Sequence, residues 1–171
     1  KKNLSDGSRD KFVKKFKKIV RQLTLNLKLK NNVFVHRDFH VSNLILKNNN
    51  IGVLDSQDAL IGNKAYDLVS LIDDVRFKTT KSLKNKLYDH YLKTEKKIDG
   101  KQFRNDFEIL SVLRNLKIIG IFTRLALRDN KKKYVKMIPY AWEMINYRMK
   151  KNREFDNLKL ILKRNFPEFV K

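Results

Sequence analysis

Cysteine is absent from this chain of 171 residues, and glycine and proline are rare, with five and two residues respectively. The lack of cysteine excludes a disulfide framework, and the low glycine and proline content excludes collagen and low-complexity disorder. Folding must therefore rely on a hydrophobic core, for which 42% of the residues are hydrophobic. Because the length is typical of one domain, we expect residues 1–171 to form a single folded unit.

Long apolar segments without charge are also lacking. The most apolar stretch, residues 109–127, contains Arg114, Lys117 and Arg124, which the interior of a bilayer would penalise heavily. We therefore expect a buried helix here and no membrane partner. The chain shows no secretory signal and begins at Lys1 rather than methionine, so we expect a cut N-terminus and a cytoplasmic protein.

Acidic residues are outnumbered by basic ones, 18 to 40, which gives a net charge of +22. Such a charge suggests an anionic partner, for example nucleic acid, acidic lipid or a phosphorylated metabolite. The basic residues are spread along the whole chain, however, and a lysine- and asparagine-rich genome would produce the same excess. Nucleic acid is thus a possible partner that we do not favour.

Hydrophobic spacing predicts a mainly α (α+β) fold. A helix is expected to end near Leu29, followed by a short buried strand at residues 33–35. The apolar runs 44–46 and 51–54, joined by the polar turn 47–50, predict a small β-hairpin. The remaining pattern is helical, with helices expected near residues 64–77, 80–93, 101–129, 134–150 and 153–165.

The most informative segment combines His36, Arg37 and Asp38 with Asn43, at the spacing H-R-D-x-x-x-x-N of kinase catalytic loops. Asp55 ends the next hydrophobic strand. In phosphoryl transfer a carboxylate such as Asp38 orients and deprotonates the attacking hydroxyl group. Asn43 and Asp55 supply the oxygen ligands that Mg²⁺ prefers beside the phosphates of ATP. We expect His36 and Arg37 to brace the loop.

This segment has two alternative interpretations. Aspartate and asparagine are common in turns, but a preceding strand and a following hairpin make a chance match improbable. His36 and His40 have the spacing H-x-x-x-H of some zinc sites, but Arg37 replaces the required glutamate and a strand precedes, so we expect no zinc. His40 is a candidate for contact with the phosphate or the acceptor.

The segments V-H-R-D-F-H-V-S-N-L (35–44) and I-G-V-L-D-S-Q-D-A (51–59) resemble the aminoglycoside phosphotransferase superfamily of small-molecule kinases. Residues 62–76 and 114–125 are similar to the branch that phosphorylates the anomeric hydroxyl of N-acetylmuramate and N-acetylglucosamine in cell-wall recycling. The resemblance implies a protein-kinase-like C-terminal lobe that uses ATP and Mg²⁺. It assigns Asp38 as the catalytic base and Asn43 and Asp55 as magnesium ligands.

The same resemblance makes Asp67 the carboxylate that braces the catalytic loop, although an acid stabilised by the helix dipole in a first turn explains it equally well. Gln57, Asp58, Asp74 and Arg76 are candidates for contacting the sugar or bracing the site, with solvated positions as the alternative.

Basic residues also share one face of the helix expected at 101–129, namely Arg114, Lys117, Arg124 and Arg128. By the same resemblance this face meets the acceptor's carboxylate or a phosphate; equally, it extends its charged ends into solvent around a buried helix.

The sequence departs from protein kinases in two ways, one that concerns the acceptor and one that concerns nucleotide binding. Asp55-Ser56-Gln57 replaces Asp-Phe-Gly and no Ala-Pro-Glu follows, which indicates a small acceptor rather than a protein. No G-x-G-x-x-G and no V-A-I-K-like strand precede the catalytic loop, so we expect the N-terminal nucleotide-binding lobe to be missing and this chain alone to be weakly active or inactive. An aminoglycoside or choline-type acceptor, or an inactive tRNA-associated module, remain alternatives to an amino sugar kinase.

Overall fold

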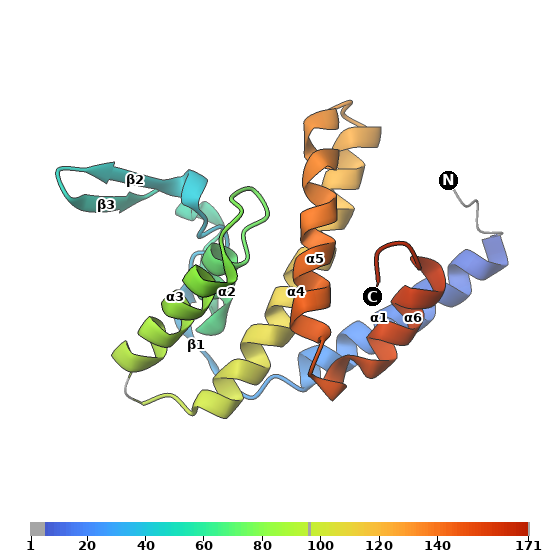
Figure 1. Cartoon of the computed structure of the whole chain (residues 1–171), viewed down its shortest axis with the longest axis horizontal. Coiled ribbons are helices and arrows are strands. Elements are labelled where there is room, and N and C mark those ends of the chain that lie inside the picture. The colour runs from blue at the N-terminus through green and yellow to red at the C-terminus, as the bar shows by residue number, and fades with distance from the viewer. Residues whose placement is uncertain (1–5, 96, 171) are drawn as a thin grey trace.

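The computed structural model describes residues 6–95 and 97–170 (Figure 1). Lys1, on which the expectation of a cut N-terminus rests, lies outside them. The α-helices of the described residues are α1 (Asp6–Leu25), α2 (Ala65–Ile72), α3 (Lys81–Thr94), α4 (Gly100–Leu127), α5 (Ile138–Met149) and α6 (Asp156–Asn165). The strands are β1 (Asn31–Val35), β2 (Leu44–Lys47), β3 (Asn50–Val53) and β4 (Leu60–Asn63). Short 3₁₀ turns are η1 (Val41–Asn43), η2 (Ser56–Asp58), η3 (Lys132–Met137) and η4 (Arg153–Phe155).

The strands form two antiparallel pairs, β1 with β4 and β2 with β3. The expected β2–β3 hairpin is present and projects from the body of the molecule (Figure 1). Its turn residues Asn48 and Asn49 have positive φ angles of 49° and 60°, the left-handed conformation that tight hairpin turns require and that asparagine tolerates. Strand β4 was not expected; it forms because Leu60–Asn63 returns to pair with β1.

The helices α1 and α2 end several residues earlier than the sequence predicts, and α5 and α6 begin later, after the 3₁₀ turns η3 and η4. The helix α1 ends at Leu25 rather than near Leu29, because the backbone N–H groups of Lys28 and Leu29 donate to Asp106 on α4. The helix α2 ends at Ile72 rather than Phe77. Residues 73–80 consequently form a loop, and this loop carries charged residues that concern the candidate site.

The long helix α4 is the central element of the fold. One hydrophobic cluster packs it against α1, α5 and α6, a second joins it to α2 and α3, and a third joins it to α5 and η3. Figure 1 shows α4 and α5 side by side, with α1 and α6 on one side of this pair and α2, α3 and the strands on the other. The expected mainly α fold with a short β-hairpin is confirmed.

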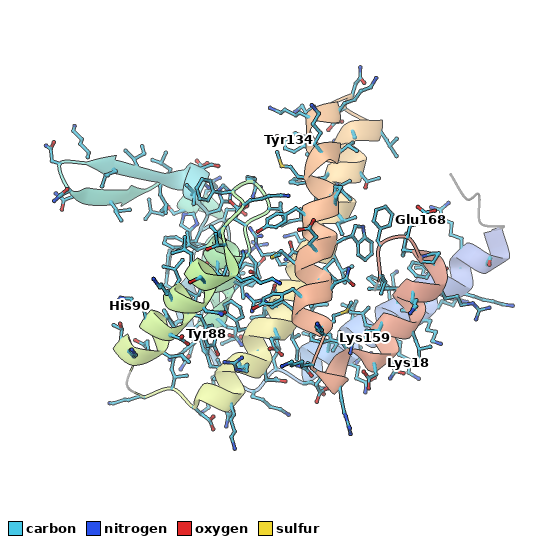
Figure 2. All side chains as sticks on the ribbon, in the orientation of Figure 1. Lys18, Tyr88, His90, Tyr134, Lys159 and Glu168 are labelled. Carbon is cyan, nitrogen blue, oxygen red and sulfur yellow. The ribbon has the colours of Figure 1, made fainter. Side chains whose placement is uncertain are left out.

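The surface charge extends far from the strands. Lys18 on α1 and Lys159 on α6 lie on the side of the molecule opposite the β2–β3 hairpin (Figure 2).

None of the helices in residues 6–95 and 97–170 combines the length and apolar character needed to cross a bilayer.

Candidate active site

The catalytic-loop segment begins directly after β1 and is held by Asp67 in the first turn of α2. The carboxylate of Asp67 accepts hydrogen bonds from the backbone N–H of His36 at 2.7 Å and of Arg37 at 3.0 Å. Arg37 has a φ angle of 73°, a conformation that costs free energy for a residue other than glycine. The two hydrogen bonds from consecutive N–H groups to one carboxylate therefore fix an otherwise unfavourable bend immediately before Asp38.

His36 and Arg37 connect this bend to the segment after the hairpin. The His36 ring is buried, and its Nε2 lies 2.8 Å from the carbonyl oxygen of Leu54. The guanidinium of Arg37 donates to the carbonyl oxygen of Asp58 at 3.2 Å. Both side chains thus hold the catalytic loop against residues 54–58.

Asp38 and Asn43 lie in one compact turn. The side-chain amide of Asn43 donates to the carbonyl oxygen of Asp38 at 3.0 Å, and the backbone N–H of His40 donates to the same oxygen at 3.0 Å. The side chain of Asp38 is exposed. Within the part of the chain that the structure describes, its carboxylate makes no hydrogen bond or ion pair, so it is free to contact a substrate hydroxyl group.

The two expected magnesium ligands are brought close together by the hairpin. The backbone N–H of Leu54 donates to the carbonyl oxygen of Asn43 at 2.9 Å, which places Asp55 beside Asn43. Because the Asn43 amide nitrogen is bound to Asp38, its Oδ1 oxygen remains for another partner. Asp55 is exposed and has a left-handed backbone, with φ 60° and ψ 47°. An amide oxygen and a carboxylate fit Mg²⁺, which commonly uses one or two protein ligands together with phosphates and water.

A second group of charged residues adjoins this loop. Asp74 is 1% exposed, and its Oδ1 accepts from the Arg76 side chain at 3.1 Å. His40 is also buried. Burial lowers the pKa of His40, and the nearby positive charge of Arg76 lowers it further, so this imidazole is neutral near pH 7. The structure thus brings together His40, Asp74 and Arg76 from the sequence-based candidates.

Gln57 and Asp58 are not part of this group. Both belong to the short turn η2, and both side chains are exposed. Among the described residues, Asp58 contacts the loop through its carbonyl oxygen, which accepts from Arg37.

Sequence reasoning missed two buried carboxylates that support the site. Asp106 on α4 accepts from the backbone N–H of Lys28 and Leu29, each at 2.8 Å, and from the Asn63 side chain at 2.7 Å. It therefore ties α4 to the end of β4 and to the segment after α1. No sequence signal marks it, since an acid within a helical pattern is normally taken as exposed.

The second missed carboxylate is Asp73, the neighbour of Asp74. Asp73 is fully buried and accepts from Arg148 on α5 at 2.8 and 3.0 Å, from Lys84 at 3.2 Å and from Ser111 at 2.6 Å. Burial opposes its ionisation, but the hydrogen bonds and charges of Arg148 and Lys84 outweigh this and lower the pKa of Asp73. The two adjacent acids thus have different partners, Asp74 close to the catalytic loop and Asp73 between α3, α4 and α5.

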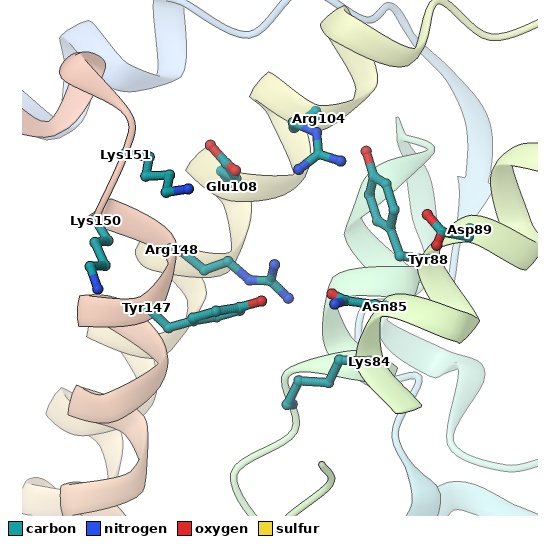
Figure 3. Close-up of a pocket in the computed structure, with 10 residues that line it drawn as sticks. All are labelled: Lys84, Asn85, Tyr88, Asp89, Arg104, Glu108, Tyr147, Arg148, Lys150 and Lys151. Carbon is teal, nitrogen blue, oxygen red and sulfur yellow. The ribbon is translucent and has the colours of Figure 1, made fainter. Parts of the chain in front are cut away.

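On the Asp73 side lies a cavity of about 410 Å³ between α3, α4 and α5 (Figure 3). Its lining includes Lys84, Arg104, Arg148, Lys150 and Lys151, and none of the sequence-predicted site residues. Lys84 and Arg148 already pair with Asp73. The cavity therefore lies apart from Asp38 and is not the predicted site.

Comparison with known proteins agrees with this architecture. The phosphotransferase enzyme family matches residues 2–101, which is more than half of the chain. The protein belongs to this family of phosphotransferases. Within it, the chain is similar to proteins named N-acetylmuramate/N-acetylglucosamine kinase.

The relative from Neisseria meningitidis serogroup B is 40% identical over 134 residues, 74% of this chain and 39% of the relative. The relative from Caulobacter vibrioides is 36% identical over 115 residues, 64% of this chain and 32% of the relative. The Pseudomonas aeruginosa relative is 38% identical over 113 residues, 63% of this chain and 33% of the relative. The matched region is thus between about a third and two fifths of each relative's length.

Proposed function

We propose that this chain is the catalytic and acceptor-binding lobe of a kinase that transfers the γ-phosphoryl group of ATP to an amino sugar. The observation that carries the proposal is the geometry of residues 36–55. An exposed Asp38 carboxylate sits on a braced turn, and Asn43 is tied both to Asp38 and to the residue before Asp55. The names of the relatives supply the amino sugar.

In this proposal Asp38 accepts a hydrogen bond, and then the proton, from the acceptor hydroxyl group. The acceptor oxygen forms a bond to the γ-phosphorus while the bond to the bridging oxygen of ADP breaks. Asn43 and Asp55 hold Mg²⁺, which when bound neutralises the charge of the phosphates. His36, Arg37 and Asp67 act by keeping Asp38 in position rather than by touching the substrates.

Nucleotide binding requires more than these residues. The sequence contains neither a G-x-G-x-x-G segment nor a V-A-I-K segment, the two features with which kinases hold ATP. We therefore propose that the lobe works with an N-terminal nucleotide-binding lobe of the same protein. Its use of ATP points to the cytoplasm as the place of action.

The test is a panel of acceptors given to the full-length protein, with ADP release as the measurement. We expect turnover of N-acetylmuramate or N-acetylglucosamine that stops when EDTA removes Mg²⁺. Turnover of choline or an aminoglycoside alone would contradict the amino sugar. No turnover of any acceptor, together with RNA binding that weakens steeply with salt, would favour a nucleic-acid-associated module instead.

A further inference from the structure

Several buried side-chain polar atoms, including Nδ1 of His36 in the loop itself, have no hydrogen-bond partner among the described residues, and three of these atoms belong to residues that interact electrostatically with one another beside Asp38. These three atoms are Nδ1 of His40, Oδ2 of Asp74 and Nη1 of Arg114. Their residues are 7%, 1% and 6% exposed. His40 and Arg114 each interact electrostatically with both Asp74 and Asp38, so the three atoms belong to one cluster next to the proposed base. Buried polar atoms in folded proteins are nearly always paired with protein, water or a ligand, so this cluster is a candidate for contact with a ligand.

The charges of this cluster favour an anion. Asp74 is the buried carboxylate here, and its Oδ1 is already paired with Arg76. Arg114 makes no ion pair with any described residue, although burial disfavours its charged form. A guanidinium stays protonated in proteins, so the cluster contains two positive groups, Arg76 and Arg114, and two negative groups, Asp74 and the exposed Asp38. Arg76 is paired with Asp74, whereas Arg114 has no ion-pair partner among the described residues, and a negatively charged ligand atom would supply one.

Arg114 differs from the other basic residues on its face of α4. Lys117, Arg124 and Arg128 are exposed, as expected for side chains that extend into solvent. Arg114 is buried, with one guanidinium nitrogen out of contact with water and without a partner. Extension into solvent therefore does not explain Arg114.

We infer that Arg114 binds a carboxylate of the acceptor and so distinguishes acidic from neutral amino sugars. The free Oδ2 of Asp74 accepts a hydrogen bond from a hydroxyl or amide N–H of the same sugar. This inference rests on the proposed function, in which the acceptor hydroxyl lies at Asp38. Of the two sugars in the relatives' names, N-acetylmuramate carries a carboxylate and N-acetylglucosamine does not.

The experiment compares kcat/KM for N-acetylmuramate, its methyl ester and N-acetylglucosamine in the full-length protein. The wild-type protein is expected to prefer N-acetylmuramate over both neutral sugars. Arg114→Met is expected to reduce this preference at least about tenfold, mainly through KM, because a charge-assisted bidentate contact is lost. The control Arg124→Met makes the same change at an exposed position of α4 and should leave the preference unchanged.

A second variant controls for misfolding, which replacement of the buried Arg114 can cause. Arg114→Lys retains the charge without the planar fork and should keep part of the preference for N-acetylmuramate over its ester. Equal losses on all three sugars in both variants, or an unchanged preference in Arg114→Met, would overturn the inference.

The inference can still be tested if the proposed function is wrong. If the wild-type protein phosphorylates none of these sugars, calorimetric binding of N-acetylmuramate without nucleotide decides the inference. Weaker binding by Arg114→Met than by Arg124→Met supports a carboxylate site even then. Equal binding by the two variants, or no binding by the wild-type protein, refutes it.

Discussion

Replacing Asp67 by asparagine removes one of the two acceptor oxygens that hold the catalytic loop. Each oxygen of Asp67 receives one backbone N–H, from His36 at 2.7 Å and from Arg37 at 3.0 Å. The side-chain amide can accept only one of these bonds and places its NH₂ group against the other N–H. A hydrogen bond to a charged group contributes about 1.5–3 kcal/mol, so we expect Asp67→Asn to lower the free energy of unfolding by about 2–3 kcal/mol.

The variant should also lower kcat, because the left-handed Arg37 is then less constrained and Asp38 follows it directly. Urea denaturation followed by far-UV circular dichroism measures the stability, and ADP release by the full-length protein measures the rate. The control is Asp89→Asn, which changes an exposed carboxylate on α3 that makes no hydrogen bond or ion pair with the described residues. If the stability of Asp67→Asn lies within about 0.5 kcal/mol of this control, the bracing role is refuted.

Three further predictions follow from other carboxylates. The pKa of Asp73 lies below its ordinary value of 3.8, so its stabilising effect is present above that pH and is lost as the pH falls below it. We expect urea denaturation to show this fall in the free energy of unfolding with falling pH in the wild-type protein. Asp73→Asn should be less stable than the wild-type protein near pH 7 and should show a smaller fall; parallel curves of stability against pH would contradict the assignment. Asp106→Ala should lower the free energy of unfolding by about 3–5 kcal/mol, because four hydrogen bonds to a buried carboxylate are lost. A loss below about 1 kcal/mol would show that water replaces the carboxylate. Asp55→Asn in the full-length protein should raise the Mg²⁺ concentration needed for half-maximal ADP release, whereas Asp58→Asn should not. Equal shifts of this concentration in both variants would show that Asp55 is not a magnesium ligand.

The close placement of Asp38, Asn43 and Asp55 could be predicted because its signal is local. Asp38 and Asn43 lie five residues apart, and the hairpin that brings Asp55 beside them is itself marked by two apolar runs and a polar turn. Helix positions followed from the spacing of apolar residues, which burial against α4 requires. Strand β4 was missed because four residues with little alternation become a strand only through pairing with β1, some thirty residues earlier in the chain.

The charged residues around the loop could not be sorted from sequence. Asp73 and Asp74 are adjacent, and only the fold shows that Asp73 pairs with Arg148, 75 residues away, while Asp74 pairs with Arg76. Arg114 looks like Arg124 in the sequence, but Arg114 is buried and Arg124 is exposed, a difference that depends on which elements pack against each turn of α4.

The central claim is that Asp38 is the base of a phosphoryl-transfer site, and a comparison of two matched variants tests it most directly. Asp38→Asn and Asp58→Asn each change one exposed carboxylate of the same loop region to its amide. With the full-length protein, ATP, Mg²⁺ and N-acetylmuramate or N-acetylglucosamine, we expect Asp38→Asn to lower kcat at least about 100-fold. Asp58→Asn should keep kcat within about twofold of the wild-type value, with unchanged unfolding temperatures in both. A kcat for Asp38→Asn equal to that of Asp58→Asn would contradict the account.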